Sequence, residues 1–449
     1  MRKILSSIKA KIETNPPAVL TIGFLFVIIV GSLLLFLPFS SNNLNFTNYL
    51  DCLFTATSSV CVTGLSTINI TSEFNYIGKS VILFLIQVGG LGFMTMATMV
   101  ALILGEKITL RDRLVIQEQM GVDRLSGMVK LIKYVIYSTF FIEGVGAFLL
   151  SFVFVPMYGI KGIFYSVFHS ISAFCNAGFD ILGDSSLAMF SHSPYLLFVI
   201  SSLIVLGGLG FNVYIDIRSL GFNFKKYSLH TKIVLVMTLG LLLLGTFAFF
   251  VLEYYNKDTF SNLNFIDKIS NSFFQSVTTR TAGFYSINQT KFTESSTILS
   301  IFLMFIGGSP ASTAGGMKTT TIFLLIVTTI SFIRNNDDIE VFKRRIDFSY
   351  VKRAVGVLII SLFLINVVVF IFTLIENYKF VDLLFETVSA FATVGLSKDL
   401  TPYLKDITKM ILIVLMFIGR VGPLTIIFSF YKKANKKKFK YADGNVIIG

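Results

Sequence analysis

Eight long apolar stretches alternate with polar segments along the chain. A bilayer core of about 30 Å needs roughly 20 apolar residues in helical conformation, and each stretch meets that length. The stretches cover 18–39, 77–104, 131–155, 194–217, 230–252, 297–332, 353–375 and 406–431. This pattern predicts an all-α integral membrane protein with eight transmembrane helices.

Four shorter apolar segments lie inside successive pairs of long stretches. They cover 48–61, 162–176, 265–279 and 379–393, and each runs into small polar residues and a glycine. Because these segments are too short to cross a bilayer, we expect four re-entrant helices, each followed by a pore loop.

The four expected loops have similar sequences, and each contains a glycine at the same place. These are Gly64, Gly178, Gly283 and Gly395, at spacings of 114, 105 and 112 residues (178 − 64, 283 − 178 and 395 − 283). Similarity at a near-constant period is typical of tandem repeats. Each repeat would contain a long helix, a pore helix with its loop, and a second long helix.

The second long helix of each repeat carries a glycine motif of its own. The motifs begin at Gly89, Gly207, Gly307 and Gly419. These glycines either belong to the conduction path or allow close packing between helices, and the sequence leaves both interpretations open. The predicted units are repeat 1 (1–106), repeat 2 (107–218), repeat 3 with a broken second helix (219–334), repeat 4 (335–431) and a basic tail (432–449).

Non-helical loops at membrane depth are stable only where they are buried in protein or line a water-filled cavity, and the sequence predicts four such loops. We therefore expect them to meet at one pseudo-fourfold pore, where backbone carbonyls replace the water around a dehydrated cation. Glycine allows the close approach and positive φ that this needs. The predicted selectivity filter consists of Val62, Thr63, Gly64, Asn176, Ala177, Gly178, Thr281, Ala282, Gly283, Thr393, Val394 and Gly395.

The sixth apolar stretch contains a run of glycine, proline and small hydroxyl residues that disfavours a straight helix. We expect a flexible intramembrane loop there, placed below the filter and able to gate it; a passive kink is the alternative. The expected gate residues are Gly307, Gly308, Ser309, Pro310, Ala311, Ser312, Thr313, Ala314, Gly315 and Gly316.

Two arginines lie at membrane depth. Arg420 occupies a position that is glycine in the other three motifs, and in the pore it would form a positive barrier to cations. An ion pair with Glu143 is the alternative. Arg280, in the third pore loop, either contributes its carbonyl to conduction or acts as a structural brace.

Composition agrees with a membrane protein. The chain is 54% hydrophobic and 14% charged, and its three cysteines give no disulfide framework or metal site. The net charge of +13 comes from clusters between apolar stretches, so it indicates cytoplasmic loops rather than nucleic-acid binding. By the positive-inside rule, both termini and the basic loops are expected in the cytoplasm. The basic tail and loops are expected to be solvated, to contact lipid phosphates or to dock an acidic cytosolic partner.

These motifs resemble those of the Ktr/Trk/HKT superfamily of potassium transporters, most closely its KtrB membrane subunits. The resemblance implies potassium selectivity at the four loop glycines, a bacterial plasma membrane, and a homodimer with one pore per chain. It also implies a cytosolic KtrA-like ring that binds ATP and ADP, with no cofactor on this chain. Promotion by sodium, a less selective potassium/sodium pore and a coupled cation symporter stay open.

The sequence favours a pore over two other classes of membrane protein. An enzyme would need clustered ionisable groups, but the three histidines, His169, His192 and His230, are not spaced with carboxylates as a catalytic or metal site. An alternating-access carrier commonly has inverted repeats and paired broken helices. Here the repeats run parallel and only one span is expected to be broken.

Overall fold

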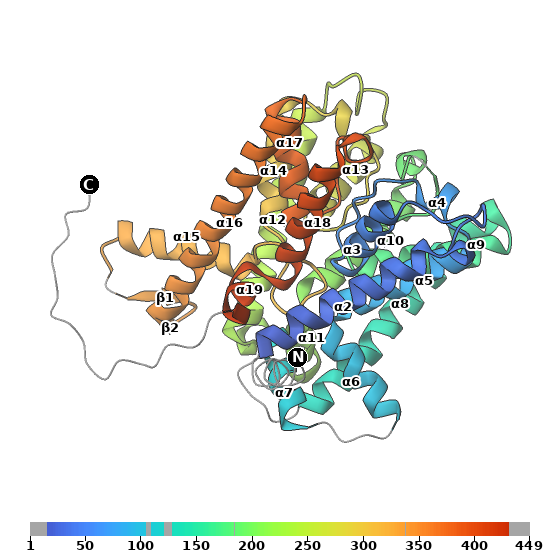
Figure 1. Ribbon diagram of the computed structural model, residues 1–449. Coiled ribbons are helices and arrows are strands. Elements are labelled where there is room, and N and C mark those ends of the chain that lie inside the picture. The colour runs from blue at the N-terminus through green and yellow to red at the C-terminus, as the bar shows by residue number, and fades with distance from the viewer. Residues whose placement is uncertain (1–15, 105–108, 121–127, 184, 337, 431–449) are drawn as a thin grey trace.

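The computed structural model describes residues 16–104, 109–120, 128–183, 185–336 and 338–430, and most of these residues are helical (Figure 1). Four helices are long and apolar enough to cross a membrane on their own. They are α2 (Pro16–Phe36), α8 (Met128–Tyr158), α12 (Leu229–Glu253) and α16 (Phe348–Ile375).

A shorter helix follows each of the long ones. The four are α3 (Tyr49–Val60), α9 (Lys161–Phe174), α13 (Phe265–Thr278) and α17 (Phe380–Phe391). They coincide within a few residues with the predicted short segments, whose helical conformation is thereby confirmed. Asn48 caps the first of them by accepting a hydrogen bond from the backbone N–H of Leu50, as expected of an asparagine at this position.

Three further apolar helices are sharply bent rather than straight. The bends are 100° between α5 (Tyr76–Leu91) and α6 (Phe93–Ile103), 91° between α10 (Pro194–Leu209) and α11 (Phe211–Leu220), and 91° between α18 (Asp406–Val421) and α19 (Pro423–Phe430). Counting each bent pair as one span, the described residues contain up to seven candidate membrane spans by length and composition.

The prediction that only one of the second helices is broken was therefore wrong. The bends fall at Gly92, Gly210 and Gly422, which have φ of 86°, 92° and 93°. A residue with positive φ cannot continue a right-handed helix, and glycine adopts this conformation without a Cβ clash. The same place in the third unit is taken by Pro310, and there the helix is interrupted by a longer loop.

That interruption separates α14 (Glu294–Phe305) from α15 (Thr319–Ile333). Residues 306–318 between them are not helical, which confirms that the sixth apolar stretch is broken. We call residues 306–318 the central loop. Its ends are paired, since the N–H of Gly307 donates to the carbonyl of Met317 and that of Thr319 to the carbonyl of Gly308.

The remaining elements lie mostly at the ends of the long helices. A two-stranded antiparallel hairpin, not expected from the sequence, joins α15 to α16. The elements are η1 (Pro38–Ser40), α4 (Ile70–Glu73), α7 (Leu110–Met120), η2 (Ala188–Phe190), η3 (Phe224–Lys226), η4 (Gln289–Lys291), β1 (Ile339–Val341), β2 (Arg344–Ile346) and η5 (Thr401–Tyr403).

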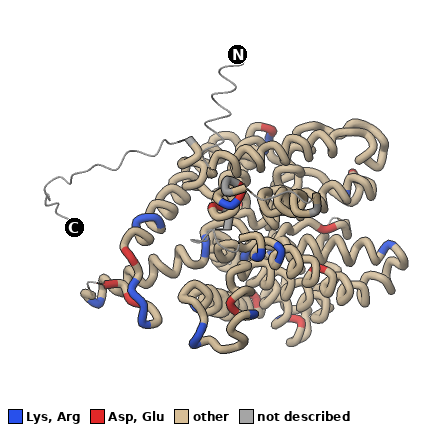
Figure 2. Tube along the Cα trace, turned by 90° about the horizontal axis from the view of Figure 1, so that it is seen from below, with Lys and Arg blue, Asp and Glu red and all other residues tan. Residues whose placement is uncertain are grey.

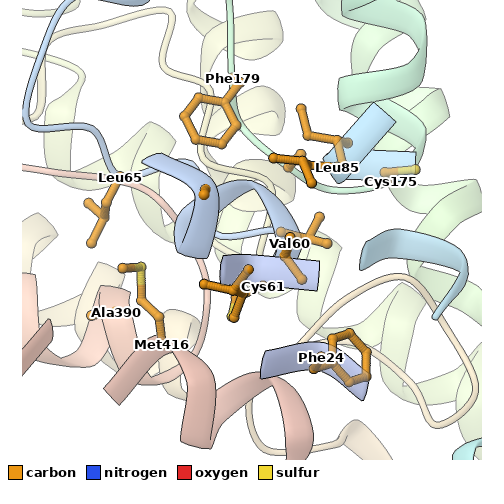
Figure 3. Packing of buried hydrophobic residues seen from close by; sticks show 14 of the residues in the cluster. Phe24, Val60, Cys61, Leu65, Leu85, Cys175, Phe179, Ala390 and Met416 are labelled. Atoms are coloured by element: carbon orange, nitrogen blue, oxygen red, sulfur yellow. The ribbon is translucent and has the colours of Figure 1, made fainter. Parts of the chain in front are cut away.

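The largest apolar cluster forms around the short helices and is shared by helices far apart in the sequence (Figure 3). Cys61 and Cys175, at the ends of α3 and α9, belong to it, as does Met416 of α18. All three cysteines, including Cys52, are buried and free. Charged residues form short, scattered segments of the trace, most of which is uncharged (Figure 2).

Candidate functional site

The four pore loops leave the C-terminal ends of the short helices in similar ways. In units 1 and 4 a helix serine accepts a hydrogen bond from the loop glycine: Gly64 N to Ser58 Oγ at 3.0 Å, and Gly395 N to Ser389 Oγ at 3.1 Å. In unit 2, Ser172 Oγ instead donates to the carbonyl of Phe179 at 2.7 Å. Each of these short helices therefore braces its own loop through a hydroxyl group.

The backbone conformation of the loops repeats in all four units. The loop glycine has positive φ, and so does the residue two places before it. The φ values are 57°, 59°, 68° and 52° at Val62, Asn176, Thr281 and Thr393, and 96°, 69°, 82° and 94° at Gly64, Gly178, Gly283 and Gly395. For a residue other than glycine such a conformation costs on the order of 1–3 kcal/mol, and it is typical of functional sites.

The four loop glycines meet in one closed ring, in chain order. A Cβ built on Gly64 would lie 3.0 Å from the Cα of Gly178, and one built on Gly178 would lie 2.8 Å from the Cα of Gly283. One on Gly283 would lie 2.7 Å from the carbonyl oxygen of Val394, and one on Gly395 would lie 3.0 Å from the Cα of Gly64. Residues far apart in sequence thus bring their backbones together where no side chain fits.

The first glycine of the motif in three second helices packs against the end of a short helix. A Cβ on Gly89 would clash with the carbonyl of Val60, and one on Gly207 with the carbonyl of Phe174. Gly419 has the same relationship to the carbonyl of Phe391. These glycines therefore have the packing role that was one of the two interpretations left open by the sequence.

The central loop contacts unit 2 through its backbone and through the hydroxyl group of Thr313. Phe211 N, just beyond the Gly210 bend, donates to the carbonyl of Ala311 at 2.8 Å. Ser309 N donates to the carbonyl of Gly208 at 3.1 Å. Thr313 Oγ1 donates to the carbonyl of Phe174 at 3.0 Å, at the end of α9. The loop is therefore held against the helix ends that also hold the second pore loop.

The central loop also lies against the fourth pore loop. A Cβ on Gly315 would clash with Thr393 Oγ1, and one on Gly316 would lie 3.0 Å from the carbonyl oxygen of Ala392. The predicted gate residues Gly307 to Gly316 all belong to this non-helical segment, which extends one residue earlier and two residues later. The loop therefore lies beside the glycine ring, on the side of the short-helix ends.

Arg420 joins the central loop to unit 1. Its Nη1 donates to the carbonyl of Thr313, and its Nη2 donates to the carbonyls of Gly89 and, at 3.2 Å, Gly90. The alternative ion pair with Glu143 is not formed. The carboxylate of Glu143 instead accepts a hydrogen bond from Gln87 Nε2 at 3.2 Å.

Arg280 and Lys318 are two further cationic residues near the loops. The Arg280 side chain is buried. Lys318 lies two residues beyond the predicted gate and was not among the residues predicted from the sequence. Its Nζ donates to the carbonyl of Ala314 at 2.8 Å, and with Arg420 it lines a cavity of about 300 Å³.

Comparison with known proteins gives consistent matches over nearly the full length of the chain. The model of the TrkH family, described as cation transport proteins, matches residues 14–441. The Ktr system potassium uptake protein B of Bacillus subtilis is 41% identical over 439 residues, covering 98% of both chains. The potassium/sodium uptake protein NtpJ of Enterococcus hirae is 41% identical over 442 residues, covering 97% of both.

A solved structure has the same fold. The potassium transporter TrkH from Vibrio parahaemolyticus superposes with a TM-score of 0.72 at 20% identity, covering 91% of this chain and 84% of that one. The family match and the two close relatives agree with the pattern of apolar helices in describing a multi-pass membrane transporter rather than an enzyme. The chain belongs to the TrkH family of cation transport proteins.

Proposed function

We propose that this protein takes up potassium through a selective pore centred on the ring of Gly64, Gly178, Gly283 and Gly395. The observation that carries the proposal is the closed ring itself, in which four backbones approach too closely for any side chain. Carbonyl oxygens are suited to replace the hydration shell of a potassium ion. The two close relatives are both named for potassium uptake.

In this proposal the chain crosses the membrane eight times, in four repeats around one pseudo-fourfold pore. The units are those of the sequence: 1–106, 107–218, 219–334 and 335–431. Each would combine a long helix, a short helix with its pore loop, and a bent or interrupted second helix. The order of elements along the chain supports this division, because it recurs four times.

The central loop is proposed as the gate and Arg420 as part of the barrier below the filter. Gly315 approaches the fourth pore loop, and Thr313 is bonded to the helix that leads into the second. Opening a path would require these contacts to break. Because the Arg420 guanidinium is bonded to a carbonyl of the loop, it would hold the gate closed as well as repel cations.

We propose sodium as a second ion that passes through the pore or as an ion that promotes potassium uptake. The positions two before the loop glycines are chemically mixed, being Val62, Asn176, Thr281 and Thr393. The relative from Enterococcus is named for both potassium and sodium. The second candidate function is therefore a less selective potassium/sodium pore or a coupled symporter of the same fold.

The proposed setting is a bacterial plasma membrane, with both termini and the basic loops in the cytoplasm. The basic tail 432–449 and residues 1–15 lie outside the described part of the chain. We propose a homodimer that contacts lipid and, since one relative is part of a Ktr system, a cytosolic KtrA-like ring that carries the ATP/ADP site. No cofactor is proposed on this chain, and no role with nucleic acid.

Flux of rubidium and sodium into proteoliposomes that contain the purified protein tests the proposal. We expect rubidium, as a tracer for potassium, to enter faster than sodium at equal gradients. Gly64→Ser should reduce that preference, because its Cβ would lie 2.6 Å from the carbonyl oxygen of Ala177. Equal rubidium and sodium rates would favour the less selective pore, and no flux of either ion would contradict both candidates.

A further inference from the structure

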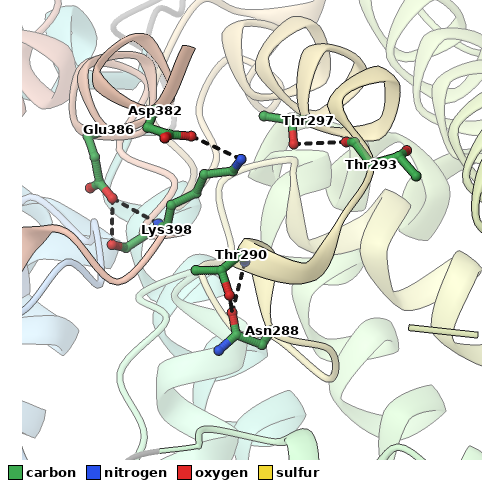
Figure 4. Close-up of polar contacts among 8 residues, drawn as sticks. Asn288, Thr290, Thr293, Thr297, Asp382, Glu386 and Lys398 are labelled. Carbon is green, nitrogen blue, oxygen red and sulfur yellow. Dashed lines mark hydrogen bonds and ion pairs between the residues drawn. The ribbon is translucent and has the colours of Figure 1, made fainter. Parts of the chain in front are cut away.

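A buried carboxylate holds the chain just beyond the fourth loop glycine (Figure 4). Glu386 of α17 is fully buried, and its oxygens accept hydrogen bonds from three groups. These are Ser397 Oγ at 2.6 Å, Lys398 N at 2.8 Å and Thr401 Oγ1 at 2.9 Å. All three donors belong to the segment 397–401, which leaves the pore loop two residues after Gly395.

A second carboxylate of the same helix holds the same segment. Asp382 lies one helical turn before Glu386, so both point from the same face of α17. Its Oδ1 is 3.1 Å from the Nζ of Lys398. Lys398 is thus bonded to α17 through both its backbone and its side chain (Figure 4).

The segment is also joined to the third unit. Asp399 Oδ2 accepts a hydrogen bond from Asn288 Nδ2 at 3.0 Å. Asn288 follows Gly283 by five residues (288 − 283), so the chain segments beyond two neighbouring glycines of the ring are connected there. Movement of segment 397–401 would therefore change the position of Gly395 relative to the third unit.

The carboxylate is specific to the fourth unit. Glu386 lies nine residues before its loop glycine (395 − 386), and the residues at the same spacing in the other units are Thr55, His169 and Phe274. A buried carboxylate is costly unless strong hydrogen bonds satisfy it, and here the chain beyond the loop supplies them. A purely structural position could be apolar, as Phe274 is.

We propose that Glu386 is a positioning residue that fixes the outer end of the fourth pore loop and thereby sets discrimination between potassium and sodium. The inference rests on the proposed pore. The fourth loop is held by the hydroxyl of Ser389, as the first is by that of Ser58, and Glu386 holds it in addition through the segment beyond the loop glycine.

The test compares the rubidium/sodium flux ratio of variants in proteoliposomes. Glu386→Ala removes the acceptor and should lower the ratio on the order of fivefold, the change that corresponds to one net hydrogen bond. Glu386→Gln should keep most of the ratio, since its Oε1 can accept from Ser397 and Lys398 while its amide donates to Thr401. Glu376→Ala is the matched control.

Glu376 also accepts hydrogen bonds from a backbone N–H and a threonine, those of Lys405 at 2.9 Å and Thr408 at 2.7 Å, but at the start of α18. Its loss should lower thermal stability and leave the ratio unchanged. If Glu386→Ala does not fold, Ser397→Ala removes one donor from the other side and should lower the ratio less.

An unchanged ratio in folded Glu386→Ala, or a ratio that falls equally in Glu376→Ala, would overturn the inference. So would an unchanged ratio in Ser397→Ala where Glu386→Ala cannot be purified. A wild-type protein that does not discriminate between the two ions would instead contradict the proposed function itself. The two failures are therefore distinguishable in one set of measurements.

Discussion

The guanidinium of Arg420 donates a hydrogen bond to the backbone carbonyl of Thr313, across more than one hundred residues of sequence. The same side chain bonds to the carbonyl of Gly89, so it joins the central loop to unit 1. An arginine that only repelled cations would not need this geometry. Arg420 therefore holds the central loop in place, in addition to placing a positive charge near the proposed pore.

Replacement of Arg420 separates these two roles. Arg420→Ala removes both charge and hydrogen bonds and should raise rubidium flux about tenfold or more, the effect of losing hydrogen bonds to a charged group. Arg420→Lys keeps the charge but loses the two-pronged geometry, so it should raise flux by a smaller factor. Both are measured in proteoliposomes, relative to the amount of folded protein inserted.

If Arg420→Lys has wild-type flux while Arg420→Ala is faster, the charge alone limits conduction and the fastening role is wrong. If neither variant differs from wild type, Arg420 has no part in limiting flux.

Shortening the central loop tests gating directly. Deletion of 311–316 removes Thr313 and Gly315, through which the loop contacts α9 and the fourth pore loop. We expect higher rubidium flux, because the loop then no longer reaches those contacts. Thr313→Val is a milder companion that loses only the hydroxyl and should give a smaller increase. Lower or equal flux in a folded deletion variant would count against gating.

The glycine bends provide a prediction on stability. Gly210 has φ of 92°, and a Cβ there would lie 2.5 Å from the carbonyl oxygen of Pro310. Gly210→Ala should therefore destabilise the protein by about 1–3 kcal/mol, seen as a lower melting temperature of the full chain in detergent. Gly240→Ala on α12 has open space around it and should stabilise slightly. Similar melting temperatures for both variants would contradict the claim that the bend at Gly210 requires glycine.

Much of the fold was predictable because the same pattern of apolar segments and glycines recurs four times along the sequence. The short helices and the four loop glycines could be placed from period and hydropathy alone. The central loop was predictable because Pro310 and its neighbouring glycines disfavour a helix wherever they occur. These features depend on local sequence, so one chain is enough to find them.

Other features depend on contacts that the sequence does not display. A glycine such as Gly92 in an apolar stretch looks the same whether it packs, kinks or bends the helix by 100°. Which of these roles the glycine has depends on the segment of the chain that packs against it. Likewise, the role of Glu386 depends on where Ser397 and Thr401 fold back, and that of Lys318 on its bond to the Ala314 carbonyl.

The junction between units 2 and 3 offers a last test. Asp216 of α11 accepts hydrogen bonds through one oxygen from Ser228 N at 3.1 Å, Ser228 Oγ at 2.6 Å and Thr231 Oγ1 at 2.6 Å. Since Ser228 is the N-cap of α12, the carboxylate joins the helix after the Gly210 bend to the next long helix.

Asp216→Ala should lower the free energy of unfolding by about 1–2 kcal/mol, an effect similar to the loss of a helix cap. Asp347→Ala is the comparison variant: Asp347, the N-cap of α16, accepts from Ser349 N within its own helix start, so its loss should lower the melting temperature less. Equal effects would mean that the link between α11 and α12 adds no measurable stability beyond that of a single helix cap.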